Sequence, residues 1–168
     1  MTGFGRTWIG IAVGLALGCG GSDGSPGSDA GTDAGTDGGT DGGTKNLANF
    51  LGAAWNATQT TTVSCPGQQP QSSTDSVSIA FSPGNGADLQ YTSQAGCTYK
   101  FNVSGNTASL SNPPVTCSTT FGTVTITLTW TSYTASTSDG HNLTLMSAGT
   151  ASASGQTCPF SITGSATR

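Results

Sequence analysis

The sequence predicts an all-β protein, and three patterns in residues 47–168 carry that prediction. Apolar and polar residues alternate with a period of two, as they do along strands that are buried on one face. Turn-forming glycine, proline and asparagine residues recur at regular intervals between the alternating stretches. No stretch repeats its apolar residues at helical spacing. Together these patterns favour consecutive antiparallel strands joined by short turns.

Residues 1–18 have the pattern of a secretory signal peptide. Arg6 precedes a run of roughly ten apolar and glycine residues, which is too short for a bilayer core that requires about twenty. A basic start, a short apolar core and small residues at its end are typical of a leader that is removed on export. We therefore expect an exported chain.

The residues LALGC at positions 15–19 resemble the lipobox of bacterial lipoproteins, with Ala16 where that family prefers leucine. The resemblance implies cleavage before Cys19, and a diacylglyceryl thioether and an N-acyl chain such as palmitate on that cysteine. Two or more acyl chains give stable membrane anchoring. No aspartate follows Cys19 directly, which in this family favours the outer membrane of the cell envelope. The alternative is ordinary secretion with Cys19 as a free thiol.

Residues 19–46 have the composition of a spacer. A tetrad of small residue, aspartate, glycine or alanine, and glycine repeats several times, without any aromatic or large apolar side chain before Leu47. Such a segment cannot bury enough apolar surface to offset the entropy of ordering, so we expect a disordered linker that spans about 25–30 Å. A calcium site is the alternative, but the tetrad lacks the hydrophobic residue of calcium-binding β-roll repeats.

Residues 47–168 are expected to form one domain of eight strands. In residues 123–131, Val124, Ile126, Leu128 and Trp130 share one face and five threonines share the other. The expected strands are 52–64, 74–82, 87–93, 96–104, 107–117, 120–134, 141–153 and 157–167. Eight antiparallel strands joined in succession can close into an up-and-down barrel, which leaves no exposed edge.

The residues LGAAWN at 51–56 resemble the opening of the lipocalin-like, or calycin, superfamily, in which a glycine shortly precedes a tryptophan of the first strand. The spacing here is one residue longer than the usual pattern. The resemblance covers residues 47–168 and implies an eight-stranded barrel whose closed end is plugged by Trp55. A late basic residue usually covers that tryptophan in the family, and Arg168 is the candidate here.

Four cysteines remain once Cys19 is assigned to lipid, and an even number in an exported chain indicates disulfides. In the expected barrel, odd and even strands run in opposite directions, which brings all four cysteines to one end. Hairpin neighbours then pair Cys97 with Cys117, and barrel closure pairs Cys65 with Cys158. A four-thiolate zinc site is the rival, but the spacings lack a C-x₂-C knuckle, so we expect no metal site.

Candidates for catalytic chemistry are few, and we expect neither an enzyme nor a cofactor. The sole histidine, His141, follows Asp139 within one turn, which is a poor arrangement for a catalytic triad. The carboxylates Asp75, Asp88 and Asp139 are isolated in sequence, and each adjoins a turn or a strand end. Charged residues make up 7% of the chain without a basic patch, which argues against a nucleic-acid partner.

The expected role is that of a monomeric, non-enzymatic envelope protein, either structural or bound to another envelope protein. One alternative is a lipocalin-like binder of a hydrophobic small molecule, and a more distant one is an exported protease inhibitor. Small barrels either fill their interior with side chains or hold one ligand, and the number of aromatic residues here favours a filled interior. The interior candidates in the sequence are Trp55, Tyr91, Phe101, Trp130 and Phe160.

Overall fold

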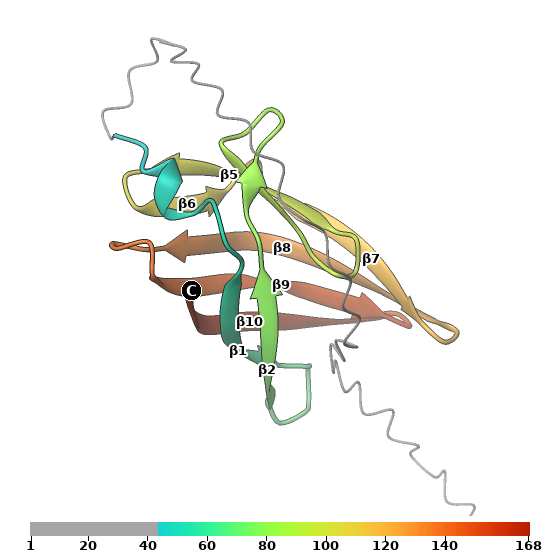
Figure 1. Cartoon of the computed structure of the whole chain (residues 1–168). Helices are drawn as coiled ribbons and strands as arrows, with labels where there is room; N and C mark the ends of the chain where they lie inside the picture. The colour runs from blue at the N-terminus through green and yellow to red at the C-terminus, as the bar shows by residue number, and fades with distance from the viewer. Residues whose placement is uncertain (1–43) are drawn as a thin grey trace, which may run out of the picture.

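A computed structural model describes residues 44–168, which form one curled antiparallel sheet (Figure 1). The expected leader (1–18), Cys19 and all but the last three residues of the expected linker (19–46) lie outside the described residues. A single 3₁₀ turn, η1 (Leu47–Asn49), precedes the strands, and residues 44–168 contain no α-helix. The strands are β1 (Trp55–Val63), β2 (Gln71–Ile79), β3 (Ser82–Pro83), β4 (Leu89–Thr92), β5 (Thr98–Ser104), β6 (Thr107–Leu110), β7 (Val115–Phe121), β8 (Val124–Ser136), β9 (Asn142–Ala153) and β10 (Gln156–Thr167).

The strand order is β2-β1-β10-β9-β8-β6-β5-β4-β3, with β7 also paired to β8. Strands that follow one another in the chain are therefore mostly neighbours in the sheet, as expected for a meander. The first and last long strands, β1 and β10, pair with each other from Asn56 opposite Thr167 to Val63 opposite Phe160. The curl brings the two ends of the sheet towards one another, so the sheet has the shape of a half-barrel (Figure 1).

The expected closed barrel of eight strands is not confirmed. Nine strands lie along one path, and within residues 44–168 its two end strands, β2 and β3, do not pair with each other. They are joined through Ala80 and Phe81, and Phe81 turns into the core beside Phe50 and Phe101, with ring centroids 5.9 and 5.6 Å away. This bend leaves only the two residues of β3 to pair with β4.

The strand expected at 107–117 is also corrected. It is divided into β6 and β7 by residues 111–114, where Asn112 has a φ of +52°. The following turn lies at Gly122, which has a φ of +60°, and not between residues 117 and 120. Glycine takes this left-handed conformation without the cost that a Cβ adds, so β7 continues until it reaches Gly122.

The core is one cluster of buried side chains that extends from Phe50 and Trp55 to Trp130 and Phe160. Trp55, Phe50, Phe101, Ile79, Leu89, Leu143 and Leu145 are the largest fully buried side chains. Complete burial of one such side chain contributes about 1.5–3 kcal/mol. Among the interior candidates, Trp55, Phe101, Trp130 and Phe160 are buried, whereas Tyr91 is partly buried and packs against the margin of the core.

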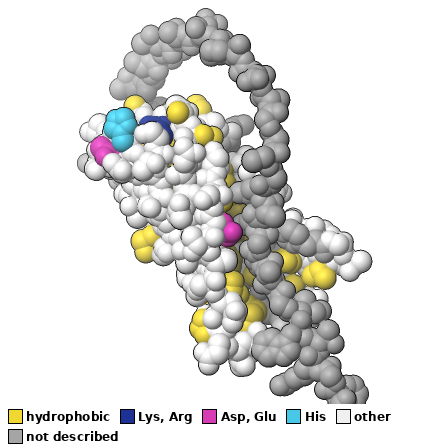
Figure 2. Space-filling model, turned by 60° about the horizontal axis from the view of Figure 1, so that its bottom comes forward, with side chains coloured by type: hydrophobic (Ala, Val, Ile, Leu, Met, Phe, Trp, Pro, Cys, Tyr) yellow, Lys and Arg dark blue, Asp and Glu magenta, His cyan; other side chains and the backbone are white. Residues whose placement is uncertain are grey.

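The outer surface consists mainly of hydroxyl side chains. Across β7 and β8, the hydroxyls of Ser118 and Thr127 lie 3.0 Å apart, and across β1 and β2 those of Thr60 and Thr74 lie 3.0 Å apart. Figure 2 shows one face of the molecule with few charged side chains. Within the described part of the chain, no helix has the length and apolar character needed to cross a membrane.

Candidate ligand-binding cavity

The end of the sheet near η1 is closed by Trp55 and Arg168. The Arg168 guanidinium carbon lies 4.2 Å from the centre of the Trp55 ring, as the resemblance in sequence led us to expect. The guanidinium also donates hydrogen bonds to five backbone carbonyls, those of Asn49, Phe50, Leu51, Ala53 and Gly140. The indole N–H of Trp55 donates to the same Phe50 carbonyl at 3.3 Å. This network covers the Trp55 ring and holds the segment before β1 against the end of β10.

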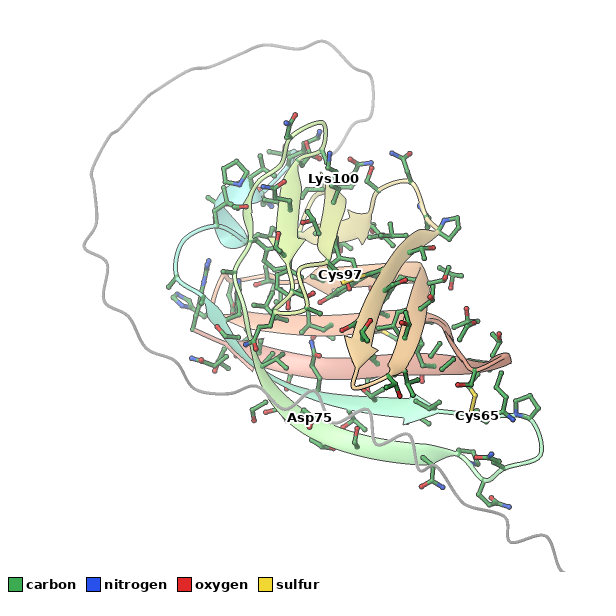
Figure 3. The ribbon with its side chains drawn as sticks, turned by 90° about the vertical axis from the view of Figure 1, so that its right-hand side faces the viewer. Cys65, Asp75, Cys97 and Lys100 are labelled. Atoms are coloured by element: carbon green, nitrogen blue, oxygen red, sulfur yellow. A yellow bond between two sulfur atoms is a disulfide. The ribbon has the colours of Figure 1, made fainter. Side chains whose placement is uncertain are left out.

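Two disulfides join strands that are distant in sequence. Cys65, just after β1, is bonded to Cys158 in β10, and Cys97, just before β5, is bonded to Cys117 in β7. These pairs agree with the pairing expected from the meander, and Figure 3 labels one cysteine of each pair. The first bridge joins β1 to its sheet neighbour, and the second attaches the tip of the β4–β5 hairpin to β7.

A cavity of about 120 Å³ lies inside the curl of the sheet. Its aliphatic wall is formed by Val77, Ile126, Leu128, Leu145 and Ile162. Its aromatic wall is formed by Tyr91, Tyr99, Trp130 and Tyr133. The expected filled interior is therefore interrupted by a cavity beside Tyr99, Trp130 and Tyr133, which are themselves buried members of the core.

The aromatic wall is held by ring contacts. The Tyr99 ring meets those of Trp130 and Tyr133 edge to face, with centroids 4.9 and 5.9 Å away, and it stacks on Tyr91 at 5.9 Å. The Trp130 ring in turn meets Phe160 at 5.4 Å. Because each ring is fixed by at least one other, the wall is a rigid surface and does not depend on a ligand for its shape.

Polar groups line the cavity at a few points. They are the side chains of Gln59, Ser78, Ser93, Gln94, Thr119 and Ser147, together with the three tyrosine hydroxyls. Burial raises the pKa of Tyr91, Tyr99 and Tyr133 above the ordinary tyrosine value. All three hydroxyls are therefore neutral at physiological pH and can donate or accept a hydrogen bond.

The tip of the β4–β5 hairpin lines one side of the cavity. Residues 93–97 form a tight turn in which the Ser93 N–H donates to the Cys97 carbonyl at 2.8 Å and the Gly96 N–H donates to the Ser93 carbonyl at 2.9 Å. Gln94 and Ala95 of this turn are exposed and line the cavity. The disulfide from Cys97 to Cys117 fixes the turn over this side of the cavity.

The isolated carboxylates stabilise loops. Asp139 accepts the backbone N–H groups of His141 and Asn142, each at 2.8 Å, and the hydrogen bonds from Asn142 contribute most to a pKa well below the usual range. Burial raises the pKa of Asp88, but the Val103 N–H and the Lys45 ammonium outweigh that effect and lower it overall. His141 is exposed in the same turn as Asp139.

Residues 44–168 contain no group of three or more histidine, cysteine or acidic side chains placed to hold a metal ion. Lys45, which the sequence assigned to the linker, pairs with Asp88 at 2.9 Å, and the Asn46 side chain donates to that of Asn106 at 2.6 Å. Lys45 and Asn46 therefore contact the folded domain.

Comparisons with protein-family models, with curated proteins and with solved structures find no match to this chain. The cavity and the residues around it are therefore the basis for a functional proposal.

Several cavity residues were not identified from the sequence. Tyr133 is one of them, because a β-bulge between Trp130 and Ser132 shifts the inward positions of β8 from even to odd numbers. The signal is present in the sequence, because the apolar positions change from even to odd numbers along β8. Ile126 and Trp130 are buried before the bulge, and Tyr133 and Ala135 are buried after it. Gln59 and Ser147 carry no such signal, because polar residues in a Thr- and Ser-rich strand are normally assigned to the solvent face.

Proposed function

We propose that this protein binds a small apolar molecule inside its curled sheet and is held at the cell envelope by a lipid on Cys19. The observation that carries the binding proposal is the hollow apolar cavity lined by residues from nearly every part of the sheet. Its volume of about 120 Å³ is of the same order as a cavity that stays dry and binds benzene. A molecule with one ring, or a short branched chain, matches that size.

The proposal includes an eight-stranded barrel architecture. Its support is that the ten strands form eight chain segments if β2 with β3, and β6 with β7, are each taken as one bent strand. The pairing of β1 with β10 joins the first of these segments to the last. The Arg168 guanidinium over Trp55 is in keeping with the lipocalin-like resemblance at residues 51–56.

The binding proposal is tested with benzyl alcohol and the folded domain. Trp130 lines the cavity, so occupancy should change its fluorescence and shift the amide resonances of Leu128 and Leu145. Leu145→Trp fills the cavity and should abolish the response. Thr144→Trp, on the exposed outer face of the same strand, is the matched control and should leave the response intact. A response of equal size in both variants would place the binding elsewhere.

The anchoring proposal has its own test in cell fractions. Cys19→Ala should release the protein from the membrane fraction or leave its leader uncleaved, whereas Ser22→Ala should do neither. A processed, membrane-bound Cys19→Ala protein would overturn the lipoprotein proposal. Native mass spectrometry of protein purified from its own host would distinguish a co-purifying small molecule from a protein partner. A protein partner is the outcome expected of a purely structural or interacting role.

A further inference from the structure

The cavity combines a hydrophobic wall with hydrogen-bonding groups that carry no charge. The titratable side chains that line it are Tyr91, Tyr99 and Tyr133, all of which are neutral phenols. Gln59 and Ser147 add an amide and a hydroxyl from β1 and β9. This set can satisfy a neutral polar group on a ligand, but it offers no opposite charge to an ion.

Charges near the cavity also disfavour an anion. Gln59 and Val77 line the cavity. Asp75 on β2 lies next to both, because it is the register partner of Gln59 and shares the inward face of its strand with Val77. The described basic side chains are occupied elsewhere: Lys45 pairs with Asp88, Lys100 donates to the Asn85 carbonyl, and Arg168 covers Trp55. Figure 3 shows Lys100 on the β5 hairpin and Asp75 on β2, well apart in that view.

The walls also indicate the shape of the ligand. Tyr91, Tyr99, Trp130 and Tyr133 present fixed aromatic rings to one side of a space of about 120 Å³. Aromatic pairs gain stability in offset or edge-to-face contact, which a flexible alkyl chain does not reproduce. A long fatty-acid chain would also exceed the cavity.

We propose that the cavity selects a neutral molecule with a single aromatic ring and one hydrogen-bonding group, and that it rejects carboxylates. This inference rests on the proposed binding function and specifies the class of ligand. Transfer of an unpaired carboxylate into such a site has a large desolvation cost, whereas a neutral amide or hydroxyl can exchange its water for the tyrosine, glutamine or serine groups.

The test compares probes of nearly the same shape by calorimetry and by amide shifts. Benzamide and benzoate differ in charge, and toluene lacks the polar group. At neutral pH we expect benzamide to bind more tightly than benzoate by more than about 100-fold, and more tightly than toluene by about fivefold, the value of one net hydrogen bond. Asp75→Asn should strengthen the binding of benzoate severalfold and leave that of benzamide unchanged.

Two variants test the hydrogen-bonding groups. Tyr133→Phe and Ser147→Ala each remove one cavity hydroxyl, and at least one of them should weaken benzamide about fivefold without changing the affinity for toluene. Thr134→Val is the control, because Thr134 is adjacent to Tyr133 but does not line the cavity. It removes a hydroxyl that donates to the Met146 carbonyl and should change neither affinity. Far-UV circular dichroism of each variant verifies that it is folded.

The outcomes separate this inference from the function on which it rests. If benzoate binds as tightly as benzamide, the cavity is a ligand site but its selectivity against carboxylates is wrong. If toluene equals benzamide and neither hydroxyl variant has an effect, the role of the polar groups is wrong. If no probe binds, toluene included, both the inference and the proposed function are overturned.

Discussion

Arg168 stabilises the closed end of the sheet through two kinds of contact at once. Its guanidinium covers the Trp55 ring, and its N–H groups donate to carbonyls of the segment before β1 and of the turn before β9. These carbonyls lie where no strand partner reaches them. One side chain therefore joins the first part of the domain, its last strand and the β8–β9 turn.

Arg168→Met should lower the free energy of unfolding by about 2–3 kcal/mol, because it removes both the cation–π contact and the charge-assisted hydrogen bonds. Lys100→Met is the matched control: Lys100 is exposed and donates only to the Asn85 carbonyl, so a change within about 0.5 kcal/mol is expected. Urea unfolding followed by circular dichroism measures both. Equal losses in the two variants would contradict the role assigned to Arg168.

The cavity tyrosines predict a loss of stability at alkaline pH. Burial raises the pKa of Tyr99 and Tyr133 above the value of 10.0 that applies in the unfolded chain. Above about pH 10 the unfolded state has therefore lost protons that the folded state still holds, and the free energy of unfolding falls as the pH rises. Urea midpoints measured between about pH 8 and pH 12 should decrease, and by less in Tyr133→Phe. An unchanged slope in that variant would count against this explanation.

At the scale of single elements, β9 contains a position that only glycine fits. A Cβ at Gly149 would meet the Thr129 carbonyl oxygen and lie 2.9 Å from Cζ of Phe160. Gly149 is the register partner of Trp130, next to the bulge of β8, so a close approach of backbones occurs where β8 changes its inward face.

Gly149→Ala should lower the free energy of unfolding by about 2–4 kcal/mol, since backbone atoms cannot move aside as a flexible side chain can. The adjacent Thr150→Ala serves as the control and should cost less than about 1 kcal/mol. Thermal unfolding of the two variants compares them directly. A Gly149→Ala domain as stable as the control would show that the sheet adjusts at this point.

The two disulfides are expected to differ in their contribution. Cys65 and Cys158 are 93 residues apart in sequence, and Cys97 and Cys117 are 20 apart. On the chain-entropy account, bridges that close loops of these lengths contribute about 4.7 and about 3.3 kcal/mol, respectively. We therefore expect the double variant Cys65→Ser/Cys158→Ser to be less stable in urea than the double variant Cys97→Ser/Cys117→Ser. The reverse order would mean that native contacts, and not loop length, set the difference.

The elements also show what alternation of residues can and cannot reveal. The strict pattern of Thr98–Ser104 predicts β5 well, because each inward residue from Tyr99 to Val103 is buried. In β8 the pattern fails after Trp130, since one inserted residue moves every later side chain to the other face. The division of 107–117 into β6 and β7 depends on packing against β8, which no local pattern contains.

At the scale of the whole molecule, the meander and the pairing of cysteines could be inferred from the sequence, whereas the hollow interior could not. The count of aromatic residues favoured a filled core, and the rings of Phe50, Phe81, Phe101 and Tyr133 do contact one another in succession within it. Tyr99, Trp130 and Tyr133 belong to the same core and form one wall of the space that remains. Composition gives the number of large side chains, and only the three-dimensional arrangement decides whether they fill the interior completely.

The register of β1 against β10 has a consequence for chain connectivity. Asn56 lies opposite Thr167, so the start of β1 lies beside the end of β10. A circular permutant that joins residues 168 and 44 through a short glycine-rich linker, and opens the chain at the exposed Ser154–Gly155 turn, should retain the native circular dichroism spectrum and both disulfides. Failure of the permutant to fold would mean that the order of synthesis, with β1 first and β10 last, is itself required for the domain to reach its structure.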